Sequence, residues 1–354
     1  MRKILIFALA FAVLSVPAAI PAEDNKDEKA KPTAEKKADK PHSGKEAEEI
    51  AQHLQDISVT IVSKSDFGGG EGSGVIKTRK LPDGSTVNFV WTAAHVVSNL
   101  RREKRIIDSK TGTPKTVVEF DDAMIVKALN EDGRMVGKIE FYAEVIRYSS
   151  EEDLALLRVR KKNFVQSNVV FHLEDKIPAI GTELYHVGSL LGQLGSNSMT
   201  RGIMSQHGRL IDKKVFDQTT VAAFPGSSGG GVYLQDGKMV GMVVRGAGET
   251  FNLIVPVRRL RDWAKSAKVE WAVDDSVKMP TEEELRKLPI EDNGVTFQYG
   301  AASDQKPDGP KKAKDVIIIG EGRFYLGDER TERQFPTLYY FQPAAVPQMR
   351  KSDE

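Results

Sequence analysis

The segment 225–230 (PGSSGG) contains a serine whose surroundings suit nucleophilic chemistry. A serine hydroxyl is a weak nucleophile at neutral pH, so it needs a positioned base and backbone N–H donors for the developing oxyanion. Gly226 would let the backbone turn its own N–H and that of Ser228 into one pocket, and the glycines at 229 and 230 leave room for substrate. Alone, the segment is also typical of a flexible Gly-Ser loop.

Two further segments supply a base and an acid. Segment 92–97 (TAAHVV) places His95 at the end of an expected strand, and segment 149–157 (SSEEDLALL) places Asp153 directly before an apolar strand. Taken singly, these residues have ordinary explanations as a core or surface histidine and a turn-capping aspartate. Their order along the chain, His, Asp, then Ser, is that of chymotrypsin and not that of subtilisin or the α/β-hydrolases. We therefore predict a catalytic triad of His95, Asp153 and Ser228, with the N–H groups of Gly226 and Ser228 as the oxyanion hole.

The elements that must position these residues are short strands. Between residues 57 and 257 no helical periodicity is sustained, and apolar, β-branched runs alternate with glycine-rich turns. This pattern indicates an all-β sandwich or barrel. The expected strands cover residues 58–62, 85–92, 139–147, 154–159, 169–173, 183–187, 238–244 and 253–257. The charged stretch 99–137 is interpreted as an insertion loop, and a helix over 257–268 is expected to close the domain.

Together these segments resemble the trypsin-like serine proteases of the HtrA/Deg type. Segments 72–76 (GSGVI), 198–205 (SMTRGIMS) and 253–257 (LIVPV) resemble further strands of that family, so the resemblance covers about residues 57–265. It implies a chymotrypsin/trypsin-like fold of two six-stranded antiparallel β-barrels with the active site between them. His95 and Asp153 would come from the first barrel and Ser228 from the second. It also implies a serine endopeptidase that acts on polypeptides, with no cofactor or metal.

The chain departs from the family pattern in three places. Ser227 stands where the family usually has asparagine, and the interval from His95 to Asp153 is long because of the 99–137 insertion. Proteins of this type usually carry a C-terminal PDZ domain. Residues 266–354 contain no Gly-Leu-Gly-like carboxylate-binding loop, so a PDZ domain is not expected.

The resemblance also implies a substrate pocket. In trypsin-like proteases its base lies six positions before the nucleophile, which is Ala222 here, with Ala223 beside it. Val244, Arg245 and Gly246 would form the opposite wall. No carboxylate stands at the base, so we predict cleavage after small or medium aliphatic residues. Arg245 could instead reach over the pocket mouth and favour acidic residues at neighbouring subsites.

The N-terminal residues have the layout of a secretory signal peptide. Arg2 and Lys3 precede an apolar stretch over 4–20, which ends among small residues at 18, 19 and 22. An uncleaved membrane anchor is the alternative, although this stretch is short for a span of about 20 residues and contains a proline. We expect residues 1–22 to be removed on export to the periplasm or outside the cell, and the mature protein to lack a membrane span.

Composition predicts the remaining organisation. Residues 23–50 are a charged tether expected to be disordered, 51–268 form the protease domain, and 269–354 form a partly disordered extension. Within that extension Thr281 is a good helix N-cap, and 316–319 with 324–326 could pair as a hairpin. The net charge of +1 gives no sign of a nucleic-acid partner, and homo-oligomerisation stays open.

Other chemistries find little support. The absence of cysteine excludes disulfides, thiol nucleophiles and thiolate metal sites. Structural roles are expected for the other histidines, which have no partner at metal-ligand spacing: His42, His53, His172, His186 and His207. Two alternatives to a protease remain: a catalytically silent protease fold acting as a binding module or chaperone, and an exported interaction protein whose residues 266–354 do the main work.

Overall fold

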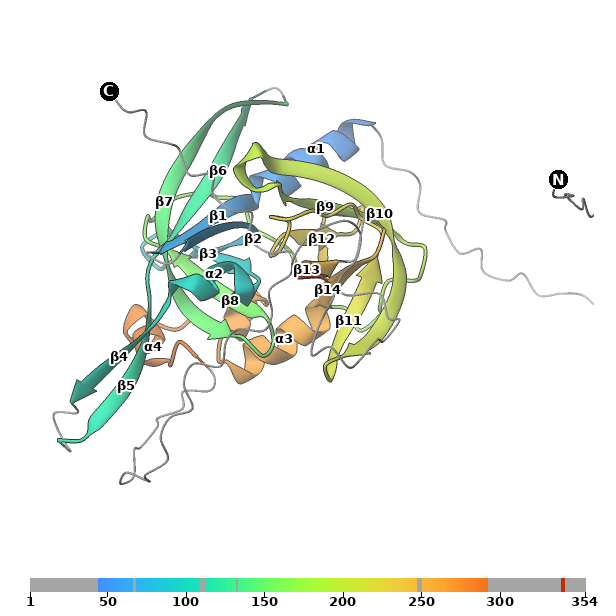
Figure 1. Ribbon diagram of the computed structural model, residues 1–354. Coiled ribbons are helices and arrows are strands. Elements are labelled where there is room, and N and C mark those ends of the chain that lie inside the picture. Colours follow the sequence, from blue (N-terminus) through green and yellow to red (C-terminus); the bar gives the residue numbers. More distant parts are fainter. Residues whose placement is uncertain are drawn as a thin grey trace, which may run out of the picture. The chain divides into compact units, whose positions relative to one another are not determined.

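A computed structural model describes residues 44–65, 68–107, 112–131, 133–246, 250–291 and 339–340. Most of these residues form antiparallel strands (Figure 1). The helices are short: α1 (Gly44–Asp56), α2 (Ala94–Val97), α3 (Val257–Ser266) and α4 (Glu282–Lys287), with 3-10 turns η1 (Ser98–Leu100), η2 (Gly192–Leu194) and η3 (Glu270–Ala272). Within the described ranges no helix has the length and apolar character needed to cross a membrane.

The first sheet is a closed six-stranded barrel. It comprises β1 (Ser58–Ser65), β2 (Gly68–Lys80), β3 (Thr86–Thr92), β6 (Ala123–Glu131), β7 (Arg134–Ser149) and β8 (Leu154–Val159), in the order β1-β2-β3-β8-β7-β6. Its interior is filled by apolar side chains that include Ile61, Val90 and Leu157, all fully buried. A Cβ at Gly74 would lie 2.4 Å from Val90 Cγ1, so the glycine in the 72–76 segment lets β2 pass close to its neighbours.

The second sheet contains β9 (Glu183–Leu190), β10 (Gly195–Ile211), β11 (Lys214–Thr219), β12 (Gly231–Tyr233), β13 (Met239–Gly246) and β14 (Asn252–Pro256). They follow the order β12-β9-β10-β11-β14-β13, and β12 also pairs with β13, so these six strands form a ring. A short β15 (Tyr339–Tyr340) pairs antiparallel with the end of β13. The prediction of an all-β fold with two six-stranded antiparallel sheets is therefore confirmed.

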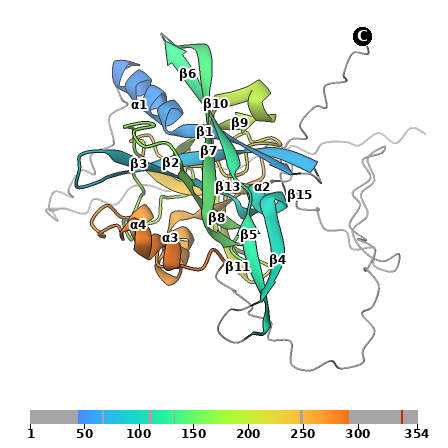
Figure 2. The same ribbon diagram turned by 90° about the vertical axis from the view of Figure 1, so that its left-hand side faces the viewer.

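Two parts of the sequence interpretation were wrong. Stretch 99–137 is not a loop: β4 (Arg101–Ile107) and β5 (Pro114–Phe120) form a separate hairpin that projects from the first barrel (Figure 2), and β6 and the start of β7 follow. Most side chains of β4 are exposed, so no apolar alternation marks this strand in the sequence. Residues 169–173 form no strand and contribute one isolated bridge, between Phe171 and Met239.

The folded part extends beyond the predicted domain limits at both ends. Helix α1 begins at Gly44, inside the segment expected to be a tether. Past Lys268, the side chains of Trp271, Ala272 and Val273 are buried. The Thr281 capping box is present at the start of α4, as predicted. The hairpin expected over 316–319 and 324–326 lies outside the described residues.

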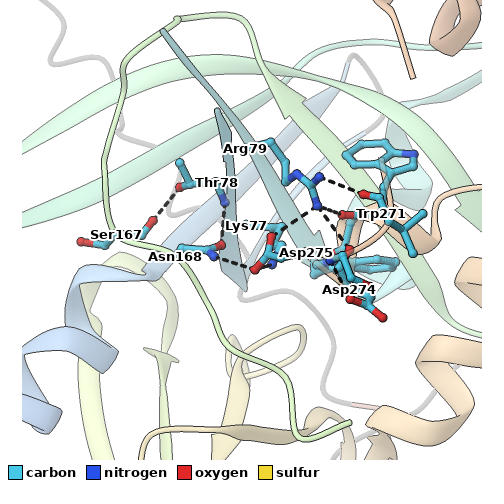
Figure 3. Close-up of polar contacts among 12 residues, drawn as sticks. Lys77, Thr78, Arg79, Ser167, Asn168, Trp271, Asp274 and Asp275 are labelled. Carbon is cyan, nitrogen blue, oxygen red and sulfur yellow. Dashed lines mark hydrogen bonds and ion pairs between the residues drawn. The ribbon is translucent and has the colours of Figure 1, made fainter. Parts of the chain in front are cut away.

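Polar contacts fasten the segment after α3 to the first barrel (Figure 3). Lys77 Nζ, on β2, lies 2.9 Å from Asp275 Oδ2, and this lysine is almost fully buried. Arg79 donates hydrogen bonds to the backbone carbonyls of Trp271 and Val277, at 2.8 and 2.9 Å. Residues 269–279 are therefore a structural part of the barrel.

Candidate active site

His95 and Asp153 are brought together at one end of the first barrel. Strand β3 ends at Thr92, and the small, buried residues Ala93 and Ala94 are the N-cap and the first residue of α2. His95 follows on that short helix. His95 Nδ1 lies 2.9 and 3.0 Å from the two carboxylate oxygens of Asp153, and the His95 backbone N–H donates to Asp153 Oδ1 at 3.0 Å. A carboxylate that accepts from Nδ1–H leaves the lone pair on Nε2. His95 Nε2 is thus the nitrogen available to accept a proton.

Asp153 is suited to stay ionised. Burial alone would raise the pKa of its carboxyl group, but the nearby His95 ring and the hydrogen bonds from His95 outweigh burial, so the pKa lies below its usual value. The positive charge of Arg245 acts in the same direction. The backbone of Asp153 has φ of 55°, in the left-handed region that residues other than glycine rarely adopt.

Ser228 lies in the loop that joins β11 to β12 of the second sheet, and hydrogen bonds and packing connect this loop to the first barrel. Ser73 on β2 donates its backbone N–H to the Ser228 carbonyl at 2.7 Å, and Gly229 donates to the Val243 carbonyl at 2.8 Å. A Cβ at Gly229 would lie 2.1 Å from Ser73 O and 2.3 Å from Thr92 Oγ1. The serine segment therefore packs directly on β2 and on the end of β3 that leads to His95. Glycine at 229 is what permits this approach.

The turn before Ser228 has a defined backbone orientation. Gly226 has φ of 94°, and the Leu191 N–H donates to the Pro225 carbonyl at 2.7 Å. Because C=O and N–H point in opposite directions across a trans peptide, the Gly226 N–H is directed away from Leu191. Ser227 is buried, and its hydroxyl oxygen accepts from the Phe224 N–H at 3.1 Å. Serine at this position can therefore brace the turn.

The residues expected to line the substrate pocket occupy different environments. Ala222 is half-buried, and its carbonyl accepts from the Thr200 hydroxyl at 2.8 Å. Ala223 and Val244 are buried in apolar clusters. Gly246, with Arg245, ends β13, where the backbone of β15 pairs with both. The pocket assignment stays a prediction.

The Arg245 side chain contacts Phe216 and Asp212. Its guanidinium carbon lies 5.1 Å from the centroid of the Phe216 ring, and its Nη1 lies 3.1 Å from Asp212 Oδ2. Its side chain is 11% exposed, and in this arrangement its charge faces Asp212. Neither contact could be predicted from the sequence pattern.

The other histidines on strands or nearby loops have structural contacts. His186 is fully buried, with Nδ1 2.9 Å from the Gly231 carbonyl, and burial lowers its pKa to about 4, so the ring is neutral. His172 Nε2 lies 2.9 Å from the Lys176 carbonyl. In the part of the chain that the structure describes, no three or more His, Asp or Glu side chains gather as a metal site.

Comparison with known proteins finds similarity to trypsin-like serine proteases. Residues 72–242 match the family model of the trypsin-like peptidase domain. A probable periplasmic serine endoprotease DegP-like of Halomonas elongata is 29% identical over 225 residues, covering 58% of this chain and 44% of that protein. The protein of the same description from Pseudomonas fulva is 28% identical over 226 residues, covering 61% and 45%. The chain thus spans less than half the length of these curated relatives. The crystal structure of the serine endoprotease from Yersinia pestis superposes with a TM-score of 0.46 at 19% identity, covering 66% of this chain and 68% of that one.

Proposed function

We propose that this chain hydrolyses peptide bonds in polypeptides through Ser228, His95 and Asp153. The match of residues 72–242 to the trypsin-like peptidase domain and the similarity to DegP-like serine endoproteases support this proposal. One observation carries the proposal. The Asp153 carboxylate lies 2.9 Å from His95 Nδ1, and the Ser228 segment packs on β2 and on the end of β3, which leads to His95.

In the proposed mechanism Ser228 Oγ attacks the scissile carbonyl carbon while His95 Nε2 takes the hydroxyl proton. The N–H groups of Gly226 and Ser228 stabilise the oxyanion. When the C–N bond breaks, His95 returns its proton to the leaving amine and an ester joins the acyl group to Ser228. His95 then removes a proton from water, which attacks the ester. The acid product leaves as the proton returns to Ser228 Oγ. Asp153 stabilises the imidazolium throughout and is not itself protonated.

We further propose unfolded polypeptides as substrates and the periplasm as location. The curated relatives are described as periplasmic, and residues 1–22 have the layout of a signal peptide. Terminal sequencing of the exported protein is expected to find a mature N-terminus between residues 19 and 25. Recovery of the full-length chain only from the cytoplasm would contradict the location.

The decisive experiment incubates mature protein with unfolded casein and maps the cleaved bonds by mass spectrometry. Ser228→Ala and His95→Ala are expected to lose turnover on the order of 10⁶-fold, the scale known for other Ser–His–Asp proteases, and Asp153→Ala less. Ser227→Ala is the matched control, because it removes the neighbouring hydroxyl, whose partner is the Phe224 N–H. Loss of activity in Ser227→Ala but not in Ser228→Ala would overturn the assignment. A wild type that neither cleaves casein nor reacts with a fluorophosphonate at Ser228 would favour the silent binding module or chaperone.

A further inference from the structure

The turn that carries Asp153 is held by residues outside the first barrel. Since a left-handed backbone is unfavourable for a residue other than glycine, the conformation of Asp153 must be imposed by its surroundings. On the N-terminal side, the Glu152 N–H donates to Ser149 Oγ at 3.1 Å. The Glu152 carbonyl, which belongs to the peptide joined to Asp153, accepts from Arg259 Nη2 at 2.8 Å. Arg259 lies on α3, after the second sheet.

The Glu152 side chain is also bound by residues of α3 and β11. Its carboxylate accepts from Arg259 Nε at 2.7 Å and from Lys214 Nζ at 2.5 Å, and Lys214 is the first residue of β11. Burial would raise the pKa of Glu152, but the hydrogen bonds from Lys214 and Arg259 outweigh it, and the pKa lies below its usual value. The carboxylate is therefore charged at neutral pH, and both cations bind it as ion pairs.

The Arg259 side chain is also held by a contact that does not involve Glu152. Its guanidinium carbon lies 4.7 Å from the centroid of the Phe216 ring, and its side chain is only 10% exposed. Phe216 is buried, and its ring also contacts Arg245. An ordered guanidinium loses little further conformational entropy when it forms its hydrogen bonds. Its planar fork donates to the backbone and to the side chain of one residue at the same time.

We propose that Arg259 is a positioning residue for the triad: by fixing the main chain and carboxylate of Glu152, it maintains the backbone conformation that directs Asp153 at His95. The proposal rests on the proposed protease function. Arg259 lies outside the proposed triad, and the contacts that link it to Asp153 run through Glu152. The alignment of the acid in the first barrel thus depends on β11 and α3 being docked beside it.

The test compares Arg259→Gln and Arg259→Lys with Arg261→Gln. Arg261 is a matched control, since it lies on the same helix and donates to the Leu173 carbonyl, away from the Asp153 turn. We expect Arg259→Gln to lower kcat on a peptide substrate by about 10- to 100-fold, less than loss of the triad aspartate, with KM within about twofold. Arg259→Lys should recover part of this loss, because lysine keeps the charge but cannot span both oxygens. Arg259→Gln combined with Glu152→Ala should lose little more than Arg259→Gln alone.

A second readout does not depend on turnover: the proton NMR resonance of His95 Nδ1–H, which the Asp153 carboxylate accepts. Arg259→Gln should shift or broaden this resonance, and Arg261→Gln should leave it unchanged. Wild-type kcat and an unshifted resonance in Arg259→Gln would overturn the proposal. The proposal would also be overturned if Arg259→Gln and Arg261→Gln lowered kcat to the same extent and lowered the melting temperature to the same extent. An inactive wild type whose resonance still responds to Arg259→Gln would contradict the protease function and leave the positioning role supported.

Discussion

Asp217 on β11 is a buried carboxylate with a strong basic partner. Its two oxygens accept from both terminal nitrogens of Arg258, at 2.6 and 2.7 Å, and Oδ1 also accepts from the Gly208 N–H at 2.9 Å. Burial would raise the pKa of Asp217, but the bonds from Arg258 and Gly208 outweigh it and the pKa lies below its usual value. A carboxylate whose pKa is lowered by folding stabilises the folded state only while it is ionised.

The direction of the Asp217 pKa shift predicts how the free energy of unfolding depends on pH. The contribution of Asp217 is complete above its unfolded-state pKa of about 3.9 and is lost as the pH falls through its lower folded-state pKa. Asp217→Asn should therefore lower the free energy of unfolding by about 2–4 kcal/mol at pH 7, and the difference from wild type should shrink below about pH 4. Urea unfolding across a pH series measures it. A difference that stays constant from pH 7 to pH 3 would show that Asp217 is not the titrating group.

Substrate preference is a second prediction at the residue scale. Ala222 offers no carboxylate, and the charge of Arg245 is directed at Asp212. An aliphatic side chain gains roughly 1.5–3 kcal/mol from burial, whereas a buried lysine or arginine without a partner loses several kcal/mol. Cleavage of a peptide library should follow Ala, Val, Ile or Leu. A profile dominated by Arg or Lys before the cleaved bond would refute the pocket assignment and leave the triad untouched.

At the scale of elements, the turn 224–229 must keep one backbone conformation. Gly226 has positive φ, and a Cβ there would lie 2.3 Å from Ser189 O and 2.6 Å from Gly192 N, both backbone atoms. Gly226→Ala should therefore displace its own N–H and lower kcat by about 10²–10³-fold, the effect of losing one oxyanion donor. Gly208→Ala is the control, because Gly208 also has positive φ but a Cβ there meets nothing within 4 Å. Steady-state kinetics with equal losses in both variants would assign the effect to general strain.

Elements with buried apolar residues could be predicted from the sequence, and mostly exposed elements could not. The bounds of β8 agree with the predicted 154–159, because its residues are almost all buried and apolar. The β4–β5 hairpin was missed because the residues of β4 are mostly charged and exposed, so they show no alternation. Motif order predicted that His95 and Asp153 would meet. The contact of Glu152 with Arg259 joins residues 107 positions apart, and in the sequence each resembles an ordinary surface charge.

At the scale of the whole molecule, residues 269–279 cover part of the first barrel. Trp271 is 2% exposed, and its ring meets that of Phe89 edge-on at 4.6 Å. The Trp91 indole N–H, which is fully buried, donates to the Ala272 carbonyl at 2.8 Å. The barrel therefore uses this segment to satisfy a polar group and to cover two aromatic rings, although the sequence after residue 268 carries no strong pattern.

Removing the Trp271 side chain should accordingly destabilise the whole fold. Trp271→Ala leaves a cavity beside Phe89, and the free energy of unfolding should fall by about 3–5 kcal/mol in guanidinium titrations. Glu283→Ala, on the exposed surface of α4, should change it by no more than about 0.5 kcal/mol. KM of folded Trp271→Ala should remain near that of wild type, because Trp271 contacts none of the proposed catalytic residues. If both variants unfolded at the same denaturant concentration as wild type, residues 269–279 would be a loosely attached extension and not part of the barrel.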